Sequence, residues 1–404
     1  MSIVLRLLRL ALPLAVTVFL TANCSAGQTA SKQQEKREAA ISFEQQGNVA
    51  EAEAAWRDVL SVHPSDAEAC AHLGLLEARQ EHYKEAIAFY RKAIAANPTM
   101  PGVRLNLGLS LFKSGEMKEA AQIFTQLLKS ERPGSQEGQR LFTLIGMAHF
   151  GSGEYAAAVP YLKKAAKSDP TNLGFRMALA QSCLASRQFQ CVLDVYREIV
   201  DLNAESAEAD MLAGEAQDEM LNTEGAVEQF RAAVKADPRL PNVHFGLGYL
   251  LWKQSKYEEA VPEFQAELEN LPDSPHALTF LADCYIQLGK PADALPLAEK
   301  AVQLDPSVAK AHLELGIIYA GSDRKPDALK EFQTSVKLDP MVADAHWRLG
   351  RLYQSLGRKE EAKAEFDKTS SLHKAENDSI FTKLKAAQDK ARPADAAHET
   401  AAPK

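Results

Sequence analysis

The sequence has no excess of basic residues and few aromatic ones. Lys and Arg number 46 against 54 Asp and Glu, which gives a formal net charge of −8. Nucleic acid binding requires clustered Lys and Arg, so we expect no nucleic acid partner. Aromatic residues make up 7% of the chain, whereas alanine is frequent throughout. This composition favours closely packed helices over a sheet-based core.

Common catalytic and nucleotide-binding motifs are also missing. The chain contains no GxSxG, no GxxxxGK[ST] and no HExxH. It has five cysteines but no CxxC pair, which argues against a zinc site. We therefore expect no enzymatic activity, no cofactor and no metal.

The first 26 residues differ in composition from the rest of the chain. Arg6 and Arg9 precede an apolar run from Leu10 to Leu20, and small residues follow. This order is typical of a secretory signal peptide, with cleavage expected after Ala26. The apolar run is about half of the roughly 20 residues that a membrane-spanning helix needs.

Two alternatives exist for this segment. One is an uncleaved membrane anchor. The other is a lipoprotein lipidated at Cys24, although Asn23 stands where a lipobox has Gly, Ala or Ser. All three cases imply export, to the periplasm, the medium or the outer membrane as a lipoprotein. Membrane attachment is expected only if Cys24 is lipidated or the signal stays uncleaved.

Much of the remaining chain is a repeated phrase. LDPSVAKAHLELGIIY (304–319) and LDPMVADAHWRLGRLY (338–353) share ten of sixteen residues at an offset of 34. The same offset, with one step of 38, connects a column of Gly or Ala: Ala40, Gly74, Gly108, Gly146, Ala180, Gly214, Gly248, Ala282, Gly316 and Gly350.

Two further columns keep this register. Twelve residues after each Gly or Ala stands Ala, or Val at position 192, and four residues later a mostly aromatic column follows. Most units close with a proline: Pro64, Pro98, Pro170, Pro238, Pro272, Pro306 and Pro340. Gly316 and Ala328 lie at similar distances from the turn of their unit, so we expect them to face each other, with Phe332 filling the space below.

Each unit has the pattern of two helices joined by a turn. In the ninth, Ala311, Leu315 and Ile318 fall on one face of a 3.6-residue period. GSDRKP (321–326) breaks the pattern, and a second apolar stripe runs over residues 328–336. The LDP at the end of that stripe closes the second helix, because the residue before a proline avoids helical geometry.

A helix–turn–helix period of 34 residues with these columns resembles the tetratricopeptide repeat. The resemblance covers about residues 33–376, or ten units, and implies an all-α, right-handed α-solenoid. The family often has Trp four residues before the glycine, where this chain has other residues: Cys70, Phe142, His244, Leu278, His312 and His346 among them. We expect this difference to alter packing at the repeat junctions.

The resulting domain organisation has seven parts. They are a signal peptide (1–26), a short linker (27–32), repeats 1–3 (33–134), an inserted loop (135–138), repeats 4–10 (139–376), a C-terminal capping helix (377–390) and a disordered tail (391–404).

Histidines and cysteines provide few candidate sites. His312 and His346 occupy equivalent places in adjacent repeats, about 10 Å apart if the helices pack normally. A metal ion needs ligands that converge more closely, so we expect packing histidines. Cys183 and Cys191 lie on the two helices of the fifth repeat, equally far from the turn, and could close a disulfide in an exported protein.

The resemblance implies that the first helix of each unit lines a concave groove. Large apolar residues occur at the groove-facing positions: Leu105, Leu109, Phe112, Met147, Phe150, Met177, Met211, Phe245, Tyr249, Trp252, Leu313 and Trp347. An exposed apolar patch of this kind is typical of a binding surface. The alternative is that the superhelix buries these residues against neighbouring first helices.

We therefore predict a non-catalytic, exported scaffold that binds a protein or peptide through its groove. One alternative is a lipid-anchored envelope assembly factor tethered through Cys24. Another is a carbohydrate- or polymer-binding solenoid in which Phe245, Tyr249 and Trp252 stack on sugar rings.

Overall fold

The computed structural model describes residues 29–202 and 206–391, and every regular element in these residues is a helix. The chain forms two compact units, Met1–Asn222 and Thr223–Lys404. The predicted signal peptide, Cys24 and residues 392–404 of the predicted tail lie outside the described residues. None of the described helices combines the length and the apolar character needed to cross a membrane.

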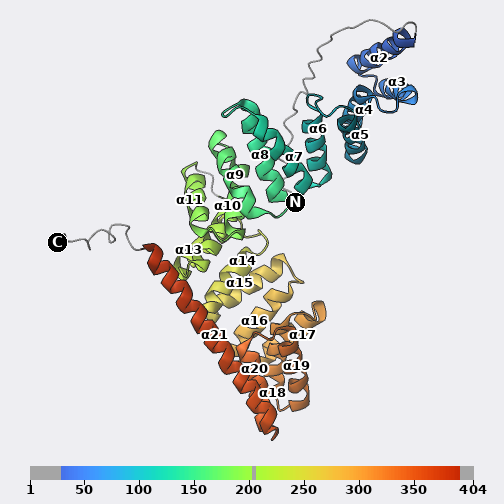
Figure 1. The fold of residues 1–404 in the computed structure, drawn as a ribbon. Helices are drawn as coiled ribbons and strands as arrows, with labels where there is room; N and C mark the ends of the chain where they lie inside the picture. Colours follow the sequence, from blue (N-terminus) through green and yellow to red (C-terminus); the bar gives the residue numbers. More distant parts are fainter. Residues whose placement is uncertain (1–28, 203–205, 392–404) are drawn as a thin grey trace, which may run out of the picture. The chain divides into compact units, whose positions relative to one another are not determined.

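The first unit consists of consecutive antiparallel helix pairs (Figure 1). Its helices are α2 (Thr29–Gln46), α3 (Val49–Val62), α4 (Ala67–Arg79), α5 (Tyr83–Ala96), α6 (Val103–Ser114), α7 (Met117–Ser130), α8 (Gln136–Gly151), α9 (Tyr155–Ser168), α10 (Leu173–Ala185), α11 (Phe189–Asp201) and α12 (Ala207–Glu219).

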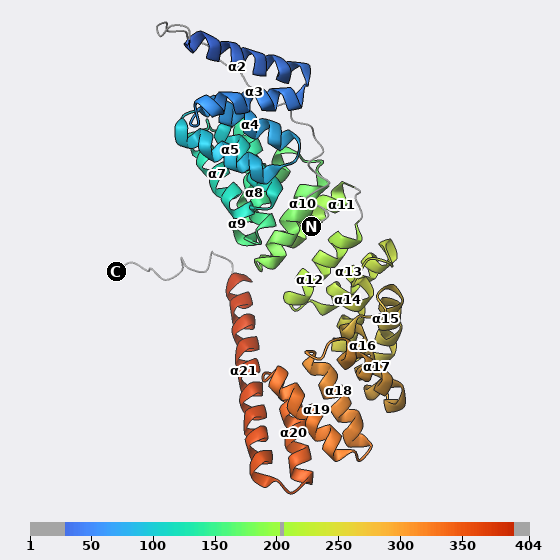
Figure 2. The same cartoon turned by 90° about the vertical axis from the view of Figure 1, so that its right-hand side faces the viewer.

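The second unit continues the same pattern (Figure 2). Its helices are α13 (Thr223–Ala236), α14 (Val243–Lys253), α15 (Tyr257–Asn270), α16 (Pro275–Gln287), α17 (Pro291–Leu304), α18 (Ala309–Gly321), α19 (Lys325–Leu338), α20 (Ala343–Ser355) and α21 (Lys359–Ala391). The predicted all-α fold of tandem helix pairs is confirmed, and even-numbered helices are the first helices of their repeats.

The turn inside each repeat has a characteristic backbone. One residue in every turn lies in the left-handed region of positive φ: Gly47, Glu81, Gly115, Gly153, Arg187, Leu221, Ser255, Gly289, Asp323 and Gly357. These residues succeed one another at steps of 34, with one step of 38. The backbone therefore repeats with the register of the sequence, even where a non-glycine residue takes the strained position.

Side-chain caps begin several of the first helices. Asp66, Ser135 and Ser274 each accept a hydrogen bond from the backbone N–H three residues later. Such a cap satisfies one of the N–H groups that a helix leaves unpaired at its start. The second helices α3, α5, α7 and α9 begin without this bond, and a single N-cap residue separates each of them from the left-handed turn residue.

The core of each repeat differs in one detail from the prediction. A Cβ added to Gly108 would lie 2.6 Å from the ring of Phe124, and one added to Gly350 would lie 2.8 Å from the ring of Phe366. The nearest neighbour of the glycine column is therefore the aromatic column of the second helix, sixteen residues later, and at Gly350 the backbone oxygen of Ala362 in the alanine column follows at 3.3 Å. Glycine is used at these places because the ring occupies the space of a side chain.

Three predicted boundaries are wrong. Helix α2 begins at Thr29, inside the predicted linker. Residues 136–138, predicted as loop, form the first turn of α8, because Ser135 accepts a hydrogen bond from the N–H of Gly138 at 2.9 Å. The predicted capping helix (377–390) belongs to the continuous α21, because Lys374 stands where a proline closes most earlier repeats.

Candidate functional site

The twelve residues predicted to face the groove lie on the first helices of seven repeats. Trp347 is exposed, at 40% of its surface, whereas Phe112, Met147 and Leu313 are buried at 3%, 5% and 4%. The prediction that these three residues face an open groove is wrong. The other eight are half-buried: Leu105, Leu109, Phe150, Met177, Met211, Phe245, Tyr249 and Trp252.

Packing between successive first helices explains the buried members. In the first unit α4 contacts α6, α8 contacts α10, and α10 contacts α12. Leu105, Leu109, Phe150 and Met177 pack against the same core as Phe112 and Met147. In this unit the alternative considered from the sequence therefore applies, since most of the apolar stripe contributes to the interior.

The second unit brings four aromatic rings together on α14 and α16. Phe245, Tyr249 and Trp252 succeed one another along α14, with ring centroids 6.3 and 5.8 Å apart. Phe280 on α16 presents an edge-on contact to each of them, at 5.7, 5.4 and 4.9 Å. We call these four half-buried residues the ring cluster. Edge-to-face and offset contacts at such distances are favourable for aromatic pairs.

Phe280 is not among the residues predicted from the sequence. It lies two residues before Ala282 of the glycine–alanine column, whereas the predicted groove residues stand at other positions relative to that column. The same place holds Gly246 in the preceding repeat and Glu314 in the next one. A large ring there is a property of a single repeat, so periodicity could not reveal it.

A set of buried charges lies against the ring cluster. The indole N–H of Trp252 donates to Asp283 Oδ2 at 2.9 Å. Lys310 Nζ on α18 donates to Asp283 Oδ2 at 2.6 Å and to Glu314 Oε1 at 2.9 Å. The same ammonium lies 4.8 Å from the ring centroid of Trp252 and 5.3 Å from that of Phe280. This network fixes the indole and joins three first helices.

Burial controls the protonation of this network. The carboxyl of Glu314 is almost fully buried, and loss of solvation raises its pKa to about 7 although Lys310 acts in the opposite direction. Burial lowers the pKa of the Lys310 ammonium, but the carboxylates of Glu314 and Asp283 outweigh this effect and raise it. Glu314 Oε2 has no hydrogen-bond partner. Lys310 therefore stays charged at neutral pH, and the carboxyl of Glu314 titrates near neutral pH.

The equivalent histidines pair with glutamates. Nδ1 of His244 lies 2.7 Å from Glu263, that of His312 lies 2.6 Å from Glu331, and that of His346 lies 2.5 Å from Glu365. In each pair the glutamate stands nineteen residues later, on the second helix of the repeat. Among the described residues, no group of three His, Cys, Asp or Glu side chains could hold a metal ion.

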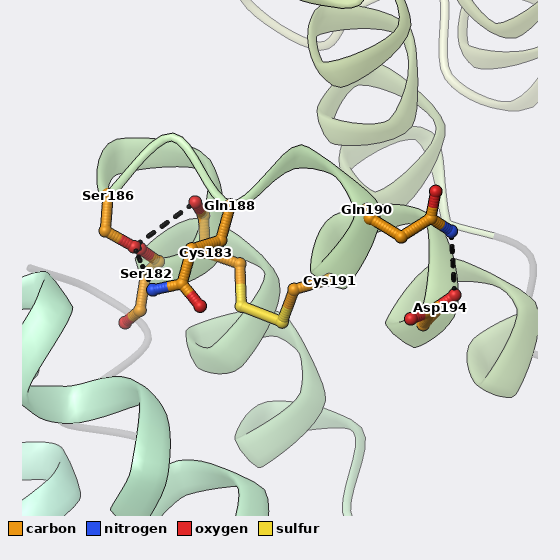
Figure 3. The surroundings of a disulfide bond; sticks show 7 residues. All are labelled: Ser182, Cys183, Ser186, Gln188, Gln190, Cys191 and Asp194. Carbon is orange, nitrogen blue, oxygen red and sulfur yellow. Dashed lines mark hydrogen bonds between the residues drawn. A yellow bond between two sulfur atoms is a disulfide. The ribbon is translucent and has the colours of Figure 1, made fainter. Parts of the chain in front are cut away.

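Cys183 and Cys191 form a disulfide in the structure (Figure 3). The bond joins α10 to α11, with the two Cα atoms 5.9 Å apart, which is within the usual range. Cys70 and Cys284 are free and buried. Burial raises the pKa of the Cys284 thiol to about 12, so this thiol is unreactive in the folded chain.

Known proteins match parts of this chain. Among curated proteins, the chain is 24% identical over 206 residues to the BBSome complex member BBS4 of Bos taurus. The match covers 51% of this chain and 39% of that protein, so the chain spans about two fifths of the length of this relative.

Solved structures match this chain at low identity, with TM-scores below 0.5. The APC/C hetero-tetramer Cut9-Hcn1 has a TM-score of 0.44 and 13% identity, over 85% of this chain and 88% of that chain. MamA has a TM-score of 0.34 and 19% identity, over 41% and 96%. YrrB, described as a TPR protein with an unusual peptide-binding site, has a TM-score of 0.36 and 22% identity, over 44% and 91%.

Family models described as tetratricopeptide repeat match most of the chain. One matches residues 37–101, 211–275 and 245–309, a second matches 77–141, 149–216 and 286–341, and a third matches 343–371. These ranges coincide with the tandem helix pairs of both units. The chain is therefore an all-helical repeat scaffold that belongs to the tetratricopeptide-repeat family.

Proposed function

We propose that this protein is a non-catalytic, exported scaffold that binds a protein or peptide partner through the ring cluster of its second unit. The observation that carries the proposal is the ring cluster itself, four half-buried aromatic side chains on two adjacent first helices. Aromatic residues at a partly open apolar surface are common energetic centres of protein interfaces. Export rests on the order of charged, apolar and small residues at the N-terminus.

The geometry of Trp252 favours a peptide over a sugar. A sugar-binding platform needs an open aromatic face, whereas the ring of Trp252 already contacts Phe280 and the ammonium of Lys310. An apolar side chain of a peptide needs only the half-buried rims of the rings. We therefore propose an apolar peptide segment as the ligand, and keep carbohydrate as an outcome of the test.

Tyr249 is the best residue for the test. Trp252 is less suitable because its removal would also take away one hydrogen bond to the buried Asp283 and the ring beside the ammonium of Lys310. The hydroxyl of Tyr249 makes no hydrogen bond within the described residues, so Tyr249→Ala removes ring contacts without leaving a polar group unpaired. A photo-crosslinking phenylalanine derivative at position 249 should capture one partner in the native envelope. The same group at Leu304, which is 40% exposed at the end of α17, is the control.

The expected result is one protein adduct at position 249 that is absent at position 304. Recovery of this partner should fall at least about tenfold in Tyr249→Ala, as truncation of an interface aromatic residue typically does, in a variant whose thermal melt is still cooperative. Equal crosslinking at both positions, or binding of glycans and not of the captured protein, would contradict the proposal.

A further inference from the structure

A cavity of about 510 Å³ lies in the first unit, lined by side chains of α9, α10 and α11. Part of its wall is apolar and includes Leu179 and Val195. The charged part includes Arg176 of α10 and two lysines of α9. The cavity belongs to a different unit from the ring cluster, so a ligand bound in it would be independent of the proposed function.

Arg176 is a buried arginine whose guanidinium is poorly satisfied. The residue is only 6% exposed, and neither Nε nor Nη1 has a hydrogen-bond partner. Its nearest carboxylate is Glu198, whose Oε2 lies 3.2 Å from Nε without hydrogen-bonding geometry and whose side chain is 56% exposed. Buried donors without acceptors are unfavourable, so an anion bound here would remove a cost that the free protein carries.

The repeats themselves explain why this arginine lacks a partner. Arg176 stands four residues before Ala180 of the glycine–alanine column, the same place that His244, His312 and His346 occupy in their repeats. Each of those histidines is paired with a glutamate nineteen residues later. In the fifth repeat the residue nineteen positions later is Val195. This repeat therefore keeps a buried cation without a carboxylate at the position used by the histidine-containing repeats, and its only ion-pair partner among the described residues is the exposed Glu198.

Two further cations line the same cavity. Lys163 and Lys167 are exposed, lie one helical turn apart on α9, and form no ion pair with a carboxylate among the described residues. Of the two acidic residues in the wall, Asp194 already accepts hydrogen bonds from Gln190 and Arg197 (Figure 3 shows the first). The wall thus has three cations against two carboxylates, a net charge of +1 in a chain of net charge −8.

We propose that this cavity binds an oxyanion with two negative charges, either a phosphate group or a dicarboxylate. The planar fork of Arg176 would donate to two oxygens of the ligand, and Lys163 and Lys167 would approach it as point charges from α9. The disulfide joins α10 to α11, and Cys191 is itself part of the wall. The site is therefore held in place before the anion arrives.

The test is calorimetric titration of the full chain with inorganic phosphate, succinate and acetate at constant ionic strength. Phosphate or succinate should bind, and acetate should bind at least about tenfold more weakly, because it carries half the charge. The dianion that binds more tightly shows whether the site prefers a phosphate group or a dicarboxylate. Arg176→Gln removes the charge but keeps a polar side chain, and it should weaken binding at least about tenfold, as loss of a charge-assisted hydrogen bond does.

Val195→Glu is a second, independent variant. It introduces the carboxylate that the histidine-containing repeats have, so it should neutralise Arg176 and abolish anion binding. Val195→Leu is the matched control and should bind like the wild type. The proposal fails if neither dianion binds, or if Arg176→Gln and Val195→Glu both retain wild-type affinity.

Discussion

The ring of Phe332 lies directly against the backbone of Gly316. A Cβ added to that glycine would be 2.4 Å from Cδ1 of Phe332, a separation that real side chains do not tolerate. Phe332 is itself buried at 2% exposure, so its ring has little room to move. The close approach of α18 and α19 therefore depends on the absence of one methyl group.

Gly316→Ala should destabilise the second unit by about 1–3 kcal/mol, the usual cost of overpacking a filled core. The free energy of unfolding, measured by urea denaturation and circular dichroism, checks this value. Gly321→Ala is the control on the same helix, because a Cβ there would meet nothing within 4 Å. It should be neutral or slightly stabilising. Equal effects of the two substitutions would show that the packing of Phe332 is misplaced.

Glu314 should make the stability of the second unit depend on pH. Its pKa rises from 4.5 to about 7 on burial, so the folded state binds more protons than the unfolded state between these values. The stabilisation is complete below the lower value and is lost as the pH rises through the higher one. The expected change between pH 5 and pH 8 is about 2–3 kcal/mol at most.

Glu314→Gln should remove this dependence and raise the melting temperature at pH 8. The variant mimics the protonated carboxyl, and Asp283 remains to pair with Lys310. Thermal melts across this pH range measure the effect, and Glu258→Gln on an exposed part of α15 should keep the wild-type slope. A slope that survives in Glu314→Gln would assign the titration to another group.

The disulfide should stabilise the first unit by about 2–3 kcal/mol, the chain-entropy value for a loop of this length. Reduction, or the double substitution Cys183→Ala with Cys191→Ala, should lower the free energy of unfolding by this amount. Thiol alkylation and mass spectrometry should find this pair linked and two thiols, Cys70 and Cys284, that react only after unfolding. A chain without Cys70 and Cys284 should respond to reductant as the wild type does. Four alkylated thiols in the unreduced chain would exclude the bond.

Processing of the N-terminus should leave Gly27 as the first residue of the exported protein, because the small residues before it fit a signal peptidase site. N-terminal sequencing of protein recovered from the envelope checks this. A chain that begins at a lipid-modified Cys24 would establish the lipid-anchored alternative, and an intact Met1 would indicate an uncleaved anchor.

The repeat architecture could be predicted because its signals are local and repeated. The columns through Gly316 and Phe332 recur from repeat to repeat, so the period and the helix pairs can be inferred from the sequence alone. The length of α21 could also have been predicted, since Lys374 replaces the closing proline. Burial of Phe112 could not, because it depends on how closely successive first helices approach, and no spacing within one repeat records that distance.

The candidate sites were harder to predict because each departs from the repeat. Phe280 and Lys310 belong to different repeats and meet only in the folded unit. Arg176 becomes noticeable only when it is compared with His312 and the glutamate that pairs with it. Periodicity reveals the residues that the repeats share, whereas these site residues occur in, or lack their usual partner in, a single repeat.

Helix α21 has a mechanical consequence. It contains 33 residues, whereas its partner α20 contains 13. At 1.5 Å per residue these lengths are about 50 and 20 Å, and α21 extends beyond the end of α20 (Figure 2). Beyond Leu372 every described side chain of α21 is exposed. A load applied at Ala391 would therefore act on the last repeat through a lever about 30 Å long. Between positions 373 and 382, where its described side chains are exposed, the stiffness of α21 comes from its own backbone, so this part of the helix can serve as a spacer arm.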